Sequence, residues 1–493
     1  MSIQERRFVW GNPFVVVSDP KLFKTIFGAA TFKRFGKDQW SYEFFRPILG
    51  RGLVTSHGKA WRKRKTAISP HLAPVQMSEM MPVFNEAAGR LCDVWKQGVK
   101  RVELDLTFRK VTLEVISEIT LGWSPEKAAV FPTLFSEIID ELNQRMFQPW
   151  RAYMPLEWEH QRRLRNLNAL VEQIIQGRKD EYTKEGYAKG LVARQQAGEN
   201  TAEVSGLKPP LCGRASVDIL DALLHADFEM PREQVSDELK TMLLAGHETS
   251  SMMLTWALFL LIKYPAEMAK AQAAVDAVCG DKARFGPGGA PRGGTIPFER
   301  DDVSKMAFLN WALQEGMRIF VPVPTLARVN HQEEDFNGHK IPANTQILIS
   351  VLSSHRDPKI WGPSVGDFRP ERMAPEKEQP EDLRIEPEFR RLREYCFLPF
   401  SVGPRDCIGR HLAVHEGVVV LAHLLHNFDF ELADGQTSDV NMDCYIIPVR
   451  PEGGIYIKVS PRKHRAGRSE DETAAKAAAA RPATSKSGTS AQS

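Results

Sequence analysis

Apolar residues recur at helical spacing over most of the chain. Between about residue 57 and residue 180, segments such as TLEVISEITL, LFSEIIDELNQRMF and LNALVEQIIQGRKDEY repeat apolar positions every three or four residues, which predicts amphipathic helices. The same pattern returns at 216–225 and 233–263. Within the second of these ranges, MMLTWALFLLI is apolar on every face, but it is shorter than the roughly 20 residues of a membrane span, so it predicts a buried helix.

Strand patterns are few and short. RRFVWGNPFVVVSDP near the N-terminus predicts a β-hairpin around Gly11-Asn12-Pro13, followed by a helix that Asp19-Pro20 opens. TQILISV and GGIYIKVS predict two further strands. The polar, glycine-rich segments 185–214 and 280–295 are expected to be surface connections. The pattern therefore predicts a mainly α fold with minor β structure.

Composition places the chain among globular proteins. Its 493 residues are 42% hydrophobic and 26% charged, which is enough to form a large core. With 65 basic and 62 acidic residues, the net charge of +3 does not indicate a nucleic-acid partner. Residues 462–493 are rich in Ala, Ser, Thr and Lys and lack aromatic residues, so they predict a disordered tail after one domain that spans residues 1–461.

The cysteines do not form a disulfide or zinc pattern. No pair has CxxC spacing, and no His/Cys cluster has zinc-site spacing. The six are Cys92, Cys212, Cys279, Cys396, Cys407 and Cys444.

One cysteine, Cys407, stands in a turn-rich loop just before an apolar helical pattern, in FSVGPRDCIGRHLAVHE at 400–416. A helix N-terminus stabilises a thiolate through its dipole and its unpaired N–H groups. Gly403 and Gly409 allow a tight backbone and the close approach of a flat partner, while Arg405 supplies a cation for an acidic group on that partner. A buried structural cysteine is the alternative. The complete pattern favours a thiolate metal ligand.

This pattern, Phe-x-x-Gly-x-Arg-x-Cys-x-Gly from Phe400 with Ala413 and Glu416 beyond it, resembles the haem-binding loop of the cytochrome P450 monooxygenases. The resemblance implies that Cys407 is the axial ligand of the iron in haem b. It also implies the cytochrome P450 fold, with the haem between a long oxygen-activation helix and the helix after the Cys loop. It covers about residues 8–460, nearly all of the predicted domain.

Two further motifs stand in the order that this family requires. LQEGMRIF contains Glu315 and Arg318, and FRPERM contains Arg372. The resemblance implies that these three residues form a cluster that braces the haem loop and serves folding and haem retention. Taken alone, a Glu/Arg pair at i, i+3 is more often a solvated surface bridge worth ~0.3 kcal/mol.

LLAGHETSS places Ala245, Gly246, Glu248 and Thr249 in a long apolar helix. Small residues let a helix approach a planar cofactor, and a Thr within a helix can bond the carbonyl four residues earlier and bend the helix. A packing glycine beside a surface glutamate is the alternative for such a fragment. The likeness to the family's oxygen-activation helix implies that Thr249 and Glu248 deliver protons.

SHGKAWRKRKTAISPHL resembles the family segment in which a Trp, and an Arg four residues later, contact a haem propionate. Trp61 matches the Trp, but Lys65 stands in place of the Arg, so a weaker or rearranged contact is expected. Arg328 in PTLARVN matches a further propionate-binding arginine. The basic run 62–65 is either a face for an acidic flavoprotein or a solvated surface.

The activity implied by the resemblance is insertion of one oxygen atom from O2 into a hydrophobic substrate. Electrons are expected from NADPH through a separate flavoprotein reductase. The substrate is expected to lie against the segment before residue 57, residues 321–324 and residues 445–448, which are mostly apolar and suit a fatty acid, sterol, terpenoid or xenobiotic. A thiolate-haem isomerase or dehydratase, which does not need the Glu248–Thr249 pair, and a non-catalytic haem-binding protein are the alternatives.

Eukaryotic microsomal members that resemble this chain carry an apolar anchor helix, a proline-rich hinge and a first helix before the hairpin, and this sequence lacks them. We therefore expect either an incomplete gene product or a soluble form. If the natural protein is anchored, the expected location is the cytosolic face of the endoplasmic reticulum membrane. The chain as given is expected to make at most peripheral membrane contact.

Overall fold

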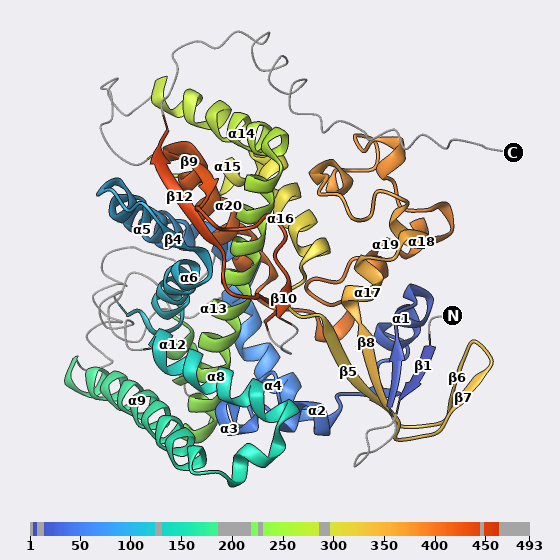
Figure 1. Ribbon diagram of the computed structural model, residues 1–493. Helices are drawn as coiled ribbons and strands as arrows, with labels where there is room; N and C mark the ends of the chain where they lie inside the picture. The colour runs from blue at the N-terminus through green and yellow to red at the C-terminus, as the bar shows by residue number, and fades with distance from the viewer. Residues whose placement is uncertain are drawn as a thin grey trace, which may run out of the picture.

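The computed structural model describes residues 3–6, 14–123, 131–185, 218–224, 230–284, 296–443 and 448–462. Figure 1 shows a mainly helical molecule in which one long helix, α13 (Arg232–Lys263), crosses the middle and a small sheet lies to one side. This arrangement confirms the predicted fold class. The segments with helical spacing are helices, because each buries an apolar face against its neighbours.

The other helices have these bounds: α1 (Pro20–Phe27), α2 (Gln39–Glu43), α3 (Arg46–Leu49), α4 (Gly58–Ile68), α5 (Met77–Lys96), α6 (Leu104–Leu121), α8 (Phe131–Phe147), α9 (Leu156–Glu185), α12 (Ile219–Leu224), α14 (Pro265–Arg284), α15 (Arg300–Lys305), α16 (Ala307–Ile319), α17 (Val351–His355), α18 (Pro358–Trp361), α19 (Arg393–Cys396) and α20 (Arg410–Asn427).

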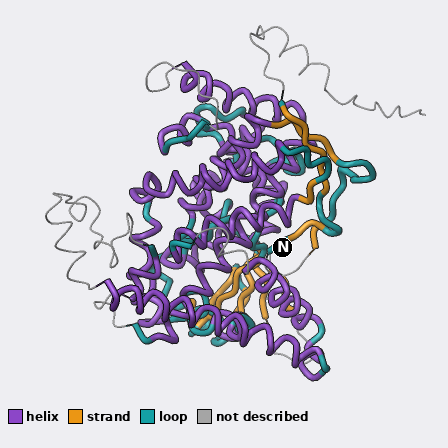
Figure 2. Tube along the Cα trace, turned by 90° about the vertical axis from the view of Figure 1, so that its left-hand side faces the viewer, coloured by secondary structure: helices purple, strands orange, loops and turns teal. Residues whose placement is uncertain are grey.

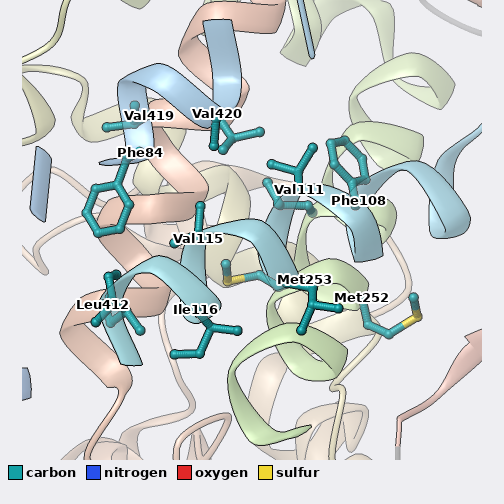
Figure 3. Close-up of a cluster of buried hydrophobic side chains, with 14 of the residues drawn as sticks. Phe84, Phe108, Val111, Val115, Ile116, Met252, Met253, Leu412, Val419 and Val420 are labelled. Atoms are coloured by element: carbon teal, nitrogen blue, oxygen red, sulfur yellow. The ribbon is translucent and has the colours of Figure 1, made fainter. Parts of the chain in front are cut away.

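The main core forms where α5, α6, α13 and α20 pack together. Figure 3 shows Phe84 of α5, Ile116 of α6, Met253 of α13 and Leu412 of α20 in one buried cluster. Full burial of such a side chain stabilises the fold by about 1.5–3 kcal/mol. At Gly417 of α20, a Cβ would lie 2.7 Å from the methyl carbon of Met253, so the glycine allows α20 and α13 to approach closely.

Helix α13 is buried on nearly every side, as the apolar stretch at 252–262 predicted. Trp256 on this helix stacks on Phe320, with 3.8 Å between the ring centroids. No single helix in the described ranges is long and apolar enough to cross a membrane. Helix α13 meets that test only together with residues 265–280, across a bend of 114°.

The largest sheet joins the N-terminal segment to strands far along the chain. Its order is β1 (Ile3–Arg6), β2 (Phe14–Val17), β8 (Gln346–Ser350), β5 (Thr325–Asn330) and β3 (Phe35–Gly36). The antiparallel pairing of β1 with β2 confirms the predicted hairpin, whose turn at 7–13 lies outside the described residues. Strand β2 then runs parallel to β8, so the N-terminal hairpin is held by a segment more than three hundred residues later.

Three small sheets complete the fold, and Figure 2 shows the strands in separate groups. Strand β12 (Tyr456–Pro461) lies between β4 (Val102–Glu103) and β9 (Phe428–Leu432). The other two sheets are the pairs β6 (Glu334–Phe336) with β7 (His339–Ile341) and β10 (Met442–Asp443) with β11 (Arg450–Pro451).

The ends of two predicted segments differ from the structure. Arg462, which the sequence assigned to the tail, donates to both carboxylate oxygens of Asp276 at 2.8 and 2.7 Å, so the folded chain extends at least through this residue. Helix α14 continues past Gly280 to Arg284, so its last turn lies in the segment 280–295 that was predicted to be a connection. Residues 463–493, 186–214 and 285–295 lie outside the described residues.

Candidate functional site

The loop before α20 has a shape that its own backbone imposes. The N–H of Cys407 donates to the carbonyl of Phe400 at 2.9 Å. Gly403 has a φ of +79°, and a Cβ there would lie 2.2 Å from the carbonyl oxygen of Phe27, so this position requires glycine on both counts. Ser401 is also left-handed, with a φ of +57°. The loop therefore places Cys407 just before the N-terminus of α20.

Cys407 differs chemically from two other cysteines. Cys92 and Cys396 are buried, and burial raises the pKa of each thiol to about 12, so both remain neutral. The Cys407 side chain is exposed. The crowding protein raises the pKa of Cys407 as well, but the N–H of Gly409 donates to its sulfur and the charge of Arg410 also lowers the pKa. These two groups favour a thiolate, but burial outweighs them, so the pKa of the Cys407 thiol stays above its ordinary value.

The absent side chain of Gly409 leaves one flank of the sulfur open. A Cβ at this residue would lie 3.8 Å from the Cys407 sulfur, which is ordinary van der Waals distance. The φ of Gly409 is −87°, so no left-handed backbone requires glycine here. A Cβ at position 409 would therefore not clash with the rest of the protein. The role of Gly409 in the approach of a flat partner stays a prediction.

Three cations gather beside the Cys loop. They are Arg405 of the loop, Arg328 of β5 and Lys37, which follows β3. Burial, with a further contribution from the charge of Arg328, lowers the pKa of Arg405 to about 10. Burial also lowers the pKa of Lys37 well below its ordinary value, with Arg405 and Arg328 adding to the effect. Cations that repel one another in this way form a binding site for an anion.

Hydrogen bonds hold the cations in place without neutralising them. Arg405 donates to the carbonyl of Ser56 at 3.0 Å, and its guanidinium carbon lies 4.2 Å from the ring centroid of Trp61. Lys37 donates to the carbonyl of Val54. In the part of the chain that the structure describes, none of the three cations forms an ion pair with a carboxylate. An anionic ligand would supply the missing counter-charge.

Lys37 was not found by sequence reasoning, and the sheet register explains why it belongs to this site. Gly36 pairs with Val329 in the antiparallel β3–β5 ladder, so the next residue on each strand brings Lys37 and Arg328 together. Nothing in the local sequence around residue 37 signals this neighbour, because the pairing joins segments nearly three hundred residues apart.

Lys65 takes a partner other than the one expected. Its ammonium lies 2.7 Å from the carbonyl oxygen of Pro404 and 2.9 Å from a carboxylate oxygen of Asp406. Lys65 thus ties α4 to the Cys loop, and its contact with a propionate stays a prediction. Its neighbour Arg64 is buried against Glu238 at 2.7 Å, so the basic run 62–65 is not a fully solvated face.

Glu315, Arg318 and Arg372 form one fully buried cluster. Arg318 donates to both carboxylate oxygens of Glu315 at 2.8 and 2.9 Å, and Arg372 donates to one of them at 3.1 Å. Their full burial excludes the alternative of a solvated surface bridge. Loss of one partner from such a cluster leaves a buried unpaired charge, at a cost of about 3–5 kcal/mol.

His355, which sequence reasoning also missed, links this cluster to the Cys loop. Arg318 donates to the His355 carbonyl at 2.9 Å, and the ring Nε2 of His355 accepts the N–H of Leu398 at 2.8 Å. Leu398 lies two residues before Phe400, whose carbonyl accepts the Cys407 N–H. Burial, together with the charge of Arg318, lowers the pKa of His355 to about 3, so its ring is a neutral acceptor at neutral pH.

The middle of α13 contains two small residues, Ala245 and Gly246, with different surroundings. Thr249 donates to the carbonyl of Ala245 at 2.7 Å, the bond that its position in the helix predicted. Ala245 is exposed within this mostly buried helix. At Gly246, by contrast, a Cβ would lie 2.5 Å from a side-chain carbon of Ile116, so this glycine lets α6 pack on α13. The packing alternative therefore applies to Gly246, and its contact with a cofactor stays a prediction.

Glu248 is buried, which excludes the surface alternative. One of its oxygens accepts from Arg450 at 2.8 Å, and the other lies 3.3 Å from the ring nitrogen Nε2 of His247. Burial by itself would raise the pKa of Glu248, but the charge of Arg450 and the bond from His247 outweigh burial and lower it. Glu248 is therefore an anion at neutral pH. Its part in proton delivery stays a prediction.

These features fit a haem better than a metal held by protein ligands alone. In the described ranges, no group of three or more His, Cys, Asp or Glu residues is placed to hold a metal ion. The exposed thiol with its N–H donor suits an iron ligand, and the three cations suit the two propionates of a haem. Together they suit a haem-thiolate centre in a mainly helical fold.

The cytochrome P450 family model matches residues 6–459, so the chain belongs to this family. Proteins of the family are haem-thiolate monooxygenases, and this chain is accordingly an oxidoreductase that uses haem and incorporates oxygen into its substrate. The expectations of family, fold and haem are confirmed.

The individual relatives are distant. Protein LUTEIN DEFICIENT 5, chloroplastic, of Arabidopsis thaliana is 28% identical over 86% of this chain and 66% of its own length. Cytochrome P450 4V2 of Pongo abelii is 26% identical over 85% of this chain and 76% of its own length. Cytochrome P450 4c21 of Blattella germanica is 28% identical over 90% of this chain and 83% of its own length. The chain thus spans about two thirds of the first relative and more of the others.

Replacement of Lys37 tests the anion site. Lys37→Met removes one of three cations, so we expect haem to leave the protein roughly tenfold faster, as loss of one charged hydrogen bond of about 1.5 kcal/mol predicts. Transfer of haem to an excess of apomyoglobin measures this rate. Lys59→Met on the exposed part of α4 is the control. Equal rates for the two variants would remove Lys37 from the site.

His355 predicts a pH dependence of stability. Its pKa rises from about 3 in the folded state to its ordinary 6.5 on unfolding, so the unfolded state binds more protons between these values. The free energy of unfolding should therefore be highest above pH 6.5 and fall as the pH drops, with a slope of up to ~1.4 kcal/mol per pH unit from this group. Urea unfolding at several pH values measures it. His355→Gln keeps an acceptor for the Leu398 N–H, and it should have a smaller slope; an unchanged slope contradicts the assignment.

Proposed function

We propose that this chain inserts one oxygen atom from O2 into a C–H bond of a hydrophobic substrate, with electrons from NADPH delivered by a separate flavoprotein reductase. The observation that supports it most is the exposed sulfur of Cys407, which accepts an N–H bond in a loop tied by hydrogen bonds to a fully buried charge cluster. The bound haem supplies the oxygen and redox chemistry. The chain supplies the ligand, the charges and the protons.

The residues that hold the haem divide by role. Cys407 binds the iron, and the Gly409 N–H lowers the basicity of its thiolate. Arg405, Arg328 and Lys37 bind the propionates, since each is a buried or half-buried cation without a carboxylate partner in the described ranges. Trp61 supports Arg405 by cation–π stacking.

Phe400, Gly403 and Gly409 shape the loop that would hold the haem, while the small side chain of Ala245 would leave room for it at α13, and Gly246 would contribute by letting α6 pack closely on α13. The left-handed backbone at Gly403 supports this assignment for the loop. The exposure of Ala245 in a buried helix supports it for α13. Lys65 contributes indirectly, because it neutralises Asp406 next to the iron ligand.

Thr249 and Glu248 direct protons to the reacting oxygen. The Thr249 hydroxyl has a donor bond to Ala245 and an oxygen that accepts, so it passes a proton by exchanging partners with a water. Glu248 is an anion at neutral pH, so any proton that it accepts is released at once and is not stored. This pair distinguishes the proposal from an isomerase or dehydratase, which does not consume protons and electrons from NADPH.

We propose a hydrophobic substrate and peripheral contact of this chain with a membrane; if the natural protein is anchored, that membrane is the endoplasmic reticulum, at its cytosolic face. Residues 321–324 are buried or half-buried and mostly apolar, which supports the substrate class, and residues 445–447 lie outside the described residues. Large apolar side chains are exposed after α8 and in the first turn of α9, as a lipid interface favours. They are Trp150, Tyr153, Met154, Leu156 and Trp158.

The iron ligand is tested by Cys407→Ala. Without the thiolate, the reduced carbon monoxide complex should lose the red-shifted absorption typical of this class of haem protein. Cys92→Ala changes a buried cysteine of the core and should keep the absorption. A Cys407→Ala protein that retains the wild-type spectrum would show that another residue binds the iron.

The catalytic role is tested by Thr249→Ala, with a reductase and a turned-over substrate. The variant should still consume NADPH but release more hydrogen peroxide and roughly tenfold less product per NADPH, because protons are misdirected. Thr249→Ser keeps the hydroxyl and should behave like the wild type. Equal product ratios in Thr249→Ala and the wild type would refute the relay, and turnover without NADPH would indicate an isomerase.

A further inference from the structure

Arg450, on the short strand β11, joins three elements that are distant in sequence. Its guanidinium donates to Glu248 of α13 at 2.8 Å and to Asp140 of α8 at 2.5 Å. Arg450 itself is only 9% exposed and Glu248 only 2%, whereas the Asp140 side chain is half exposed. One guanidinium therefore bridges a buried carboxylate and a partly solvated one.

The backbone beside Arg450 is fixed by hydrogen bonds to Pro322 and Trp256. The N–H of Val449 donates to the carbonyl of Pro322 at 3.0 Å, and the carbonyl of Val449 accepts the indole N–H of Trp256 at 3.0 Å. Pro322 lies in the segment assigned to the substrate, and Trp256 lies on α13. Both bonds fix the backbone at Val449, the residue before Arg450. The Arg450 side chain is therefore preorganised to contact Glu248.

The electrostatics around Glu248 depend on this arginine. His247 on the same helix and Arg109 on α6 also favour the ionised carboxylate, but Arg450 contributes most among them. Asp105 on α6 pairs with Arg109, and Asp140 on α8 shares Arg450. Removal of Arg450 takes away the largest single contribution that opposes burial, so the pKa of Glu248 should rise from its lowered value.

We propose that Arg450 is a positioning residue that holds the carboxylate of Glu248 in its buried position on α13, one residue before Thr249, and that its bond to Asp140 couples this arrangement to the position of α8. The inference rests on the proposed function, because it acts through the proposed proton relay. It adds a residue from the C-terminal strand pair that no motif in the sequence indicates. It also implies that displacement of α8 changes proton delivery before it affects haem binding.

The first test reads the charge of Glu248 directly in the haem-loaded protein. At neutral pH, infrared difference spectra should show a protonated, buried carboxylic acid in Arg450→Gln but not in the wild type or in Arg450→Gln/Glu248→Gln. Arg462→Gln is the matched control, because Arg462 pairs with Asp276 and takes no part in this network. If Arg450→Gln shows no such band, the inference is wrong whether or not the protein turns over substrate.

The second test measures product per NADPH across pH. Arg450→Gln should give a ratio that falls roughly tenfold at neutral pH and varies with pH, whereas the double variant should give a low ratio that does not vary. Arg450→Lys keeps the charge and should recover most of the loss. A loss that Arg450→Lys does not recover, or that is the same at every pH in the single variant, would indicate a merely structural role.

Asp140→Asn separates the two bonds of Arg450. It should keep the wild-type infrared spectrum, since Glu248 retains its cation, but increase the peroxide fraction at least twofold. A wild-type peroxide fraction would remove α8 from the proposal. If the wild-type protein makes no product with NADPH, the proposed function fails, while the infrared comparison still decides whether Arg450 controls Glu248.

Discussion

The site depends on the buried salt-bridge cluster of Glu315, Arg318 and Arg372. Charges so deep in a protein are tolerated only when every one is paired, so the cluster fixes α16 and the segment after it in one arrangement. His355 links this cluster to the Cys407 loop, because its carbonyl accepts a hydrogen bond from Arg318 and its ring accepts one from the N–H of Leu398. The position of the exposed Cys407 sulfur thus follows from interactions among buried groups, which limit the conformations of the loop.

The second constraint is a group of positive charges that, unlike the salt-bridge cluster, have no counter-charge within the described chain. Lys37, Arg328 and Arg405 lie together without carboxylate partners in the described ranges, and burial lowers the pKa of each. Their repulsion destabilises the protein in the absence of an anion. A ligand that carries two carboxylates removes that repulsion, so its binding free energy adds to the stability of the folded state. With the propionates bound to these cations as proposed, haem binding and folding would be coupled through charge as well as through the iron.

Helix α13 combines a packing contact, exposed positions and a buried charge network within residues 245–249. Gly246 is required by the packing of Ile116, whereas Ala245 and Thr249 face away from that contact and retain exposed or half-exposed positions. Glu248 lies between them in sequence but is directed into a charge network with Arg450, Arg109 and Asp105. Within little more than one helical turn, the period of 3.6 residues directs neighbouring residues to different faces, which separates the exposed positions, the packing contact and the charge network.

The sequence by itself determined the class of fold, the helical segments, the N-terminal hairpin and the likeness of the Cys loop to a known family. These depend on local periodicity and on residues close together in the chain, such as Phe400 to Gly409. Tertiary structure alone decided that Lys37 joins the cations, that His355 links the charge cluster to the loop, and that Arg450 meets Glu248. It also gave Lys65 a loop partner and Gly246 a packing role. Each of these contacts joins segments that are far apart in the chain, and only the pairing of strands and the packing of helices set their distances.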